Sequence, residues 1–352
     1  MANLANLPLR FLAASGRHGA ALLAVGIFGG ALIPPLAAAF RGLITPDVLI
    51  MMTLVLLRVD LPGTVAHLRR PLRVAVIIGV LLVASPAIAW LAVAALTLGP
   101  GIREGVVIFA CGCAAASSPA FARMVGLDPE LSLIVSLATT ALVPLTAPPI
   151  ALGLMGFDLS ISPTAFMTRL LLVVGLPMLV SVTLRRVIGR ERLPRYGDAV
   201  DGTLVWTVVV YGFGVMDGLG PRAASDPAWV MQAIAAAFLV SFGLNLATTL
   251  ALLPLGRRAA ASAGMMSGNR NMALFLATLP ATTDQRIALF FGLCQFPLFL
   301  SPFLLRPVYR LILRNVLAQN VTPGLDPGVQ GRPAAAPQRL DPRVKPGGDG
   351  AG

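Results

Sequence analysis

Charged side chains are scarce in this sequence. Asp, Glu, Lys and Arg make up 12% of the 352 residues, and the mean hydropathy is +0.83. A soluble protein carries roughly 25% charged residues, so half that density cannot solvate a water-facing surface of this size. This excludes a soluble globular protein. Because hydrophobic segments recur from Ala20 to Leu313, we predict one integral membrane domain and no separate soluble domain.

Lysine is almost absent, since Lys345 is the single lysine among 27 basic residues, and acidic residues are too few to balance the arginines. The resulting net charge of +12 could indicate nucleic-acid binding, because basic patches bind phosphates. However, the cations cluster in short segments between apolar stretches, as the positive-inside rule predicts for cytoplasmic loops. The positions of the basic residues therefore mark the cytoplasmic loops of a membrane protein, and we expect no nucleic-acid partner.

Cysteine and histidine are equally rare. The three cysteines lie inside apolar segments and imply no disulfide framework. Cys111 and Cys113 could suggest a thiolate site for a soft metal, but residues two apart on a helix point about 200° apart. We therefore interpret them as packing residues and expect no metal site and no cofactor. Both histidines, His18 and His67, lie in segments expected to be cytoplasmic, so neither is a proton relay at the bilayer midplane.

The apolar stretches divide into ten segments of the length that crosses a bilayer, which takes about 20 residues. The sequence thus predicts an all-α integral membrane protein of about ten transmembrane helices. The expected spans are 20–40, 43–59, 72–98, 105–124, 131–155, 165–185, 200–216, 229–254, 260–279 and 287–313.

The arginines fix the orientation of these spans. With the N-terminus inside, seventeen arginines fall in inner segments and five in outer ones, which predicts that both termini are cytoplasmic in a bacterial cell membrane. Residues 1–19 are then a cytoplasmic lead-in, and 20–318 are the transmembrane domain. Residues 319–352 contain two related copies of a Pro- and Gly-rich unit that cannot bury enough apolar surface to fold, so we predict a disordered cytoplasmic tail.

The fourth and ninth spans are interrupted in their middles. The fourth contains Ser117, Ser118 and Pro119, and the ninth contains the run from Ser267 to Asn271. Four and nine are corresponding places in two halves of five spans, and Ser118 and Gly268 are 150 residues apart. Paired interruptions indicate a transporter binding site near the midplane, where two inverted repeats, about 20–156 and 164–314, cross. An ordinary proline kink is the alternative for the first interruption.

Arg270 is the charge at mid-depth in this pattern. Such a charge costs roughly 2.5 to 3.5 kcal/mol on insertion scales, so it needs a partner or a water-filled cavity. The acidic residues fall at span edges or in loops, so the sequence offers no obvious partner. Half-helix N-termini carry partial positive charge, so an unpaired arginine beside them predicts a binding site for an anion. The alternative interpretation is that Arg270 forms a structural ion pair.

At these motifs the sequence resembles a family, the bile acid:sodium symporter superfamily, with its organic-anion members and related arsenite exporters. LSLIVSLATTALVPLTAPPI (Leu131 to Ile150) is similar to the family's fifth helix, CGCAAASSPAF to its fourth, and GNRNMALFLATL to its ninth. The resemblance covers the ten spans. It implies a ten-helix inverted repeat with the fourth and ninth helices crossing at the substrate site.

The same resemblance implies that sodium coupling is doubtful. Where sodium-coupled members place ligand side chains, this sequence has Met266, Arg270, Pro119 and Leu81, besides Ser118. Sodium prefers several oxygen ligands, and a guanidinium would repel it by several kcal/mol at short range, with an effective dielectric of about 20.

The sequence therefore predicts a secondary transporter of a small organic anion, with the lipid bilayer as its other partner. A channel-like or proton-linked uniporter or exporter, including one for arsenite-type oxyanions, is the alternative. An intramembrane enzyme is less favoured, because no paired aspartates, Ser/His dyad or Asp-rich motif lies at membrane depth, so no catalytic residues are assigned. The predicted substrate-binding residues are Arg270, Asn269, Asn271, Ser117, Ser118, Ser267, Thr139 and Thr140.

Overall fold

The computed structural model describes residues 11–12, 15, 19–58, 71–155, 162–189, 192–280 and 282–319. In these residues the chain is helical, and its only β-type pairing is one isolated bridge between Ala114 and Arg270. Most of the predicted N-terminal lead-in, and the predicted tail from residue 320 onward, lie outside the described residues. The chain divides into two units, Met1–Leu313 and Arg314–Gly352. The helix packing and the site described below lie in the first unit.

The surface of this unit has the character of a membrane protein. Large apolar side chains point outward along the helices: Leu72 and Val187 are each 77% exposed, and Leu179 is 64% exposed. Serine, threonine and asparagine side chains, in contrast, lie buried among the apolar residues of the interior. Lipid tails solvate apolar side chains and leave polar groups without partners, so this distribution fits a bilayer. The chain is a multi-pass helical membrane protein.

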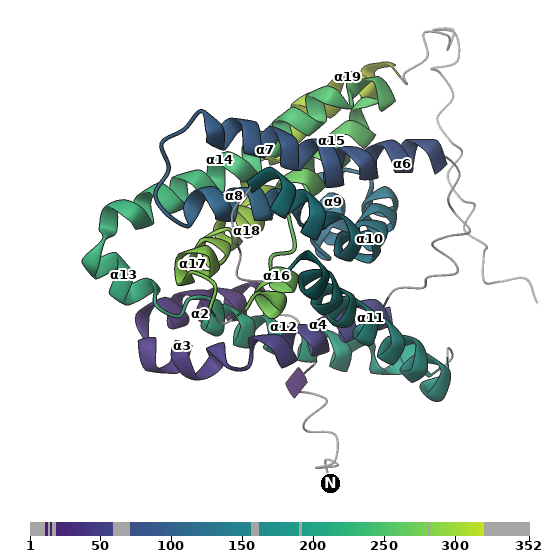
Figure 1. The fold of residues 1–352 in the computed structure, drawn as a ribbon. Coiled ribbons are helices and arrows are strands. Elements are labelled where there is room, and N and C mark those ends of the chain that lie inside the picture. Colours follow the sequence, from purple (N-terminus) through teal and green to yellow (C-terminus); the bar gives the residue numbers. More distant parts are fainter. Residues whose placement is uncertain are drawn as a thin grey trace, which may run out of the picture. The chain divides into compact units, whose positions relative to one another are not determined.

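The first part of the chain forms α2 to α10 (Figure 1). A π-helical segment, η2, joins α6 to α7, and these three form one continuous span. The bounds are α2 (Gly19–Leu32), α3 (Pro34–Arg41), α4 (Ile44–Arg58), α6 (Pro71–Gly79), η2 (Val80–Ala84), α7 (Ser85–Ala94), α8 (Ile102–Cys111), α9 (Ser118–Val125) and α10 (Pro129–Met155).

The second part forms α11 to α19. Helix starts here follow local capping signals: Ser162 accepts a hydrogen bond from the Ala165 amide, and Asp226 accepts one from the Trp229 amide. The bounds are α11 (Pro163–Ile188), α12 (Gly197–Val215), α13 (Leu219–Ser225), α14 (Pro227–Ala251), α15 (Arg257–Gly268), α16 (Ala273–Thr278), α17 (Gln285–Leu293), α18 (Gln295–Leu304) and α19 (Arg306–Gln319).

The predicted spans coincide with helices, but several are divided. Those expected at 105–124 and 260–279 break in their middles, as predicted, and the one at 287–313 is three consecutive helices. The span expected at 20–40 is interrupted at Ile33, before Pro34 and Pro35. Its second part, α3, and the next span, α4, form a pair of helices bent by 68°. By length and composition, six helices of the described chain can cross a membrane, or seven if that bent pair counts as one.

The helices of the unit associate in two groups, and α10 of the second group packs along α11 of the first. In the first group, α2 and α3 pack along α12, and α4 packs between α11 and α12. In the second group, α14 packs along α15, α7 along α8, and α10 along both α8 and α9. Helix α16 contacts both α4 and α11, so the end of the span that breaks between α15 and α16 reaches the first group.

Candidate crossing site

The first broken span changes direction at Gly112. Helix α8 ends at Cys111, Gly112 has an extended backbone, and α9 does not begin until Ser118, followed by Pro119. Proline fits the first turn of a helix because its missing N–H would have no intrahelical partner there. The sequence CGCAAASSP therefore leaves a short non-helical segment at the centre of the span.

The second broken span has the same design. Helix α15 ends at Gly268, Asn269 has an extended backbone, and α16 begins at Ala273. This segment is deeply enclosed: each residue from Ala259 to Phe275 is buried, and Arg270 is only 1% exposed.

The two breaks hydrogen-bond to each other as a short antiparallel bridge. The Asn271 amide donates to the Cys113 carbonyl at 2.9 Å, and the Ala115 amide donates to the Asn269 carbonyl at 2.9 Å. Backbone freed from one helix is thus satisfied by backbone freed from the other, as hydrocarbon requires. The two predicted interruptions, in 105–124 and 260–279, therefore meet in the structure.

Arg270 lies at this crossing, and its guanidinium donates to backbone carbonyls. Nε donates to the Ser267 carbonyl at 2.8 Å, Nη1 to the Gly112 carbonyl at 2.7 Å, and Nη2 to the Leu81 carbonyl at 3.0 Å. Nη2 also lies 3.3 Å from the Ser267 hydroxyl. Among the described residues the ion pairs involve other arginines, and each lies at least partly in solvent. The cation is thus held by peptide dipoles.

Hydroxyl groups extend this network between spans. The Ser267 hydroxyl lies 2.9 Å from that of Ser85 and accepts a hydrogen bond from Thr248 at 2.8 Å. The Thr139 hydroxyl accepts from the Ala114 amide at 3.2 Å. Five spans therefore meet at the crossing through short polar contacts: those of α7, α10 and α14 and the two broken ones.

The remaining predicted residues lie around the same point. Asn269 and Ser301 exchange hydrogen bonds at 2.9 and 3.1 Å, and the Thr140 hydroxyl donates to the Ser136 carbonyl at 2.7 Å. Ser118 is fully buried, yet its hydroxyl has no hydrogen-bond partner. Ser117, in contrast, is partly exposed. The structure thus places the eight predicted residues on the two breaks and on the neighbouring α10.

Asp47 was missed as a candidate, because it falls close to the start of a predicted span. It lies in the first turn of α4, is 6% exposed, and its Oδ2 atom has no hydrogen-bond partner. Tyr211 of α12 is close enough to interact with it electrostatically. The sequence does contain a pattern that could have indicated its burial. Ile44, Val48 and Met52 recur every four residues and form the buried face of a helix, and Asp47 lies beside that face.

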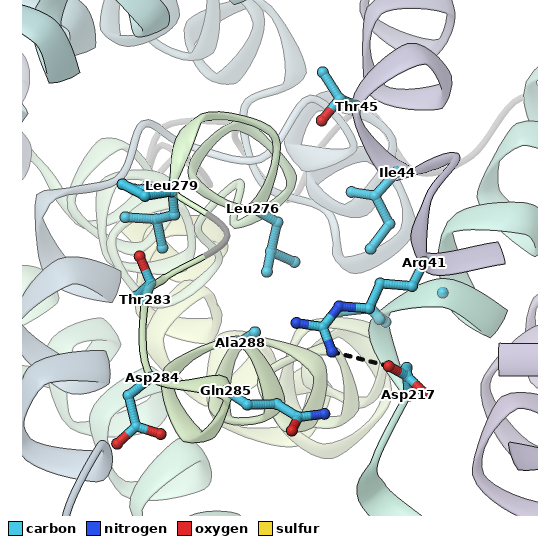
Figure 2. A pocket seen from close by; sticks show the side chains of 13 residues that line it. Arg41, Ile44, Thr45, Asp217, Leu276, Leu279, Thr283, Asp284, Gln285 and Ala288 are labelled. Carbon is cyan, nitrogen blue, oxygen red and sulfur yellow. Dashed lines mark hydrogen bonds and ion pairs between the residues drawn. The ribbon is translucent and has the colours of Figure 1, made fainter. Parts of the chain in front are cut away.

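A cavity of about 150 Å³ lies beyond the far end of α16, and Figure 2 shows it. The Arg41 guanidinium is 2.9 Å from the Asp217 carboxylate at its wall. Leu276 of α16 also lines it, and the hydroxyl of Thr283, another lining residue, is buried without a partner. None of the eight predicted residues lines this cavity. Helix α16 therefore connects two separate places: the crossing at its start and the cavity at its end.

Broken spans that meet in the interior of a helical membrane protein are a common arrangement at the binding sites of transporters. Residues 45–215 match the model of the Sodium Bile acid symporter family, so this part of the chain is similar to that family. The family consists of membrane transporters. The match includes the first break and ends before the second, so Arg270 lies outside the matched residues. No curated protein matches the chain.

Proposed function

We propose that this protein is a secondary transporter of a small organic anion, built from ten spans in two inverted repeats of five. One observation carries the proposal: the breaks in the fourth and ninth spans pair with each other through backbone hydrogen bonds. Transporters place their substrate sites at such paired breaks.

The packing of the helices supports the inverted repeat. Helix α2 packs along α12, and α4 packs along α11. In the ten-span numbering these contacts join spans one and seven, and spans two and six. In an inverted repeat, span one corresponds to span six and span two to span seven. This exchange turns the contact between spans one and seven into the contact between spans six and two, as an internal two-fold axis requires.

Reporter fusions test the ten-span count. A reporter fused after Leu317 is expected in the cytoplasm of a bacterial host, as is one in the loop 189–196, whereas one in 220–227 is expected in the periplasm. If two of the three reporters lie on the opposite side, the count is wrong.

The start of α9 is the part of the crossing best placed to bind an anion. Ser117 is partly exposed, and Ser118 carries a buried hydroxyl that no other group uses. The amides at a helix start favour anions, and the charge of Arg270 adds to the same field. We therefore propose that Ser117, Ser118 and the partly buried Thr140 contact the anion. Arg270 would supply charge, and Ser267, Asn269, Asn271 and Thr139 would hold the breaks in place.

Transport is expected to be independent of sodium. Leu81 and Met266 belong to one buried apolar cluster, so two positions that implied sodium ligands by resemblance offer no oxygen from their side chains. Uptake of an anion identified by a thermal-shift screen should agree within about twofold in sodium and in choline buffers. A change of about tenfold, worth about 1.4 kcal/mol, would contradict this.

Proton coupling is the second candidate, and Asp47 favours it. A buried carboxylate with an unpartnered oxygen is costly in hydrocarbon, and such residues form proton pathways in transporters. If Asp47 carries the proton, Asp47→Asn should abolish uptake driven by a pH gradient while leaving exchange of labelled for unlabelled anion intact. Thr45→Ser, two residues away, is the matched control. Equal loss of both activities in Asp47→Asn would indicate a structural role.

A further inference from the structure

Each of the three carbonyls around Arg270 lacks an ordinary helical partner, and each for a separate reason. The Gly112 carbonyl lies just after the end of α8, and the Ser267 carbonyl lies in the last turn of α15. The last four carbonyls of a helix have no amide ahead of them to accept from. Two of the three oxygens are therefore free because the spans are broken.

The third carbonyl is free because of Pro86. In the π-helical segment η2, the Ser85 amide donates to the Val80 carbonyl, five residues back. The same spacing would pair the Leu81 carbonyl with the amide of residue 86, which is proline and has none. The Leu81 carbonyl thus points to a partner outside its own helix, and Arg270 Nη2 is that partner.

The electrostatics of this place favour a cation. The C-terminal end of a helix carries a partial charge of about −0.5, and the ends of α8 and α15 both contribute carbonyls to the guanidinium. Unwound carbonyls and half-helix C-terminal ends are also the groups that coordinate monovalent cations in transporters. The neutral oxygens at 2.7 to 3.0 Å around Arg270 form a carbonyl cage of this kind.

We propose that the guanidinium of Arg270 is a tethered replacement for a bound monovalent cation. It fills the carbonyl cage formed by Leu81, Gly112 and Ser267, and so holds the two breaks and the third span together without an added ion. Arg270 is a positioning residue in this scheme. The proposal concerns the protein without substrate, so it does not depend on which anion is transported or on whether one is.

The test is whether a free cation can occupy the cage once the tether is removed. Arg270→Ala is purified from membranes as the full chain, with millimolar guanidinium chloride, sodium chloride or urea present from solubilisation onward. Thermal unfolding is then measured in detergent. Urea has the planar shape of guanidinium without its charge, so it controls for simple filling of the space.

We expect Arg270→Ala to lower the Tm by more than about 5 °C, because three buried carbonyls lose their donors. Guanidinium or sodium should recover at least half of this loss with saturation, whereas urea should not. The parent protein and the matched variant Arg58→Ala, whose arginine pairs with Asp201 at the surface, should show no such recovery. An unchanged Tm, equal recovery by urea, or no recovery by either cation would overturn the proposal.

If Arg270→Ala does not accumulate in membranes, two further variants test whether the site requires a cation. Arg270→Lys keeps the charge and loses the planar fork, whereas Arg270→Met keeps much of the volume and loses the charge. The proposal requires the lysine variant to accumulate in membranes to at least about twice the level of the methionine variant. Equal accumulation, or more of the methionine variant, would mean that Arg270 fills space and that no cation is needed.

Discussion

The two broken segments at the crossing are built alike but enclosed differently. In the first, Ala116 is exposed, Ser117 is partly exposed, and the Ser118 hydroxyl is unpartnered. In the second, Ser267, Asn269 and Arg270 are all buried, and each makes a side-chain hydrogen bond to another span. Under the proposed function, the first break would contact the anion and the second would hold the crossing together.

The glycines at the two breaks give the largest expected contrast. A Cβ at Gly268 would overlap the Ser241 carbonyl of α14, which is backbone and cannot move aside, whereas at Gly112 it would meet the flexible Met272 Cε at 2.6 Å. We expect Gly268→Ala to destabilise by more than about 3 kcal/mol and Gly112→Ala by about 1 to 2. Thermal unfolding of both variants measures this. If Gly112→Ala is the less stable of the two, the second break is not the more rigid one.

The hydroxyls of Ser267 and Ser118 should respond in opposite ways. Ser267→Ala leaves Ser85 and Thr248 without their shared partner, so we expect a loss of about 1 to 3 kcal/mol. Ser118→Ala removes a buried hydroxyl that has no partner, so stability should stay equal or rise. Unfolding in detergent compares the two. A marked loss in Ser118→Ala would show that its hydroxyl already has a structural partner.

The pair of Asn269 and Ser301 should couple the second break to α18. The two side chains exchange hydrogen bonds in both directions, so a double-mutant cycle with Asn269→Ala and Ser301→Ala should give a coupling of about 0.5 to 3 kcal/mol. Ser117→Ala combined with Ser301→Ala serves as the additive control. A coupling near zero for the Asn269 pair would place the stability of the second break elsewhere.

The smallest effect on stability and the clearest effect on binding are expected at Ser117. This residue is partly exposed, so Ser117→Ala should change the Tm by less than about 2 °C, as surface substitutions do. Loss of one hydrogen bond to a charged ligand should weaken anion binding about tenfold or more. Titration of the anion identified by thermal shift measures this. Unchanged affinity would move the proposed anion site away from the start of α9.

Much of the helix layout could be predicted from the sequence, because each span is a local apolar run ended by charge, glycine or proline. The two breaks were predicted for the same reason, since Ser117 to Pro119 and Ser267 to Asn271 interrupt otherwise apolar segments. The interruption at Ile33, before Pro34, and the division of the last span were not predicted. The helices that result are too short to establish ten spans by length alone.

The partners of Arg270 could not be predicted from the pattern. Its carbonyl acceptors at Gly112 and Leu81 are 158 and 189 positions away in the chain. The sequence pattern was searched for acidic partners, whereas the guanidinium donates its hydrogen bonds to neutral backbone carbonyls. The buried position of Asp47 and the cavity beyond α16 also depend on how distant helices pack. The role of the eight predicted residues in binding stays a prediction.

The π-helical turn at Val80–Ala84 makes the third span sensitive to the number of its residues as well as to their identity. Deleting one residue there would return the span to ordinary α-helical register and rotate everything before it by about 100° relative to Ser85. The Leu81 carbonyl would then no longer face Arg270, and no side-chain substitution could re-aim it. Homologues that carry an arginine at this crossing should therefore keep the extra residue, and those that shorten the segment should lack the arginine.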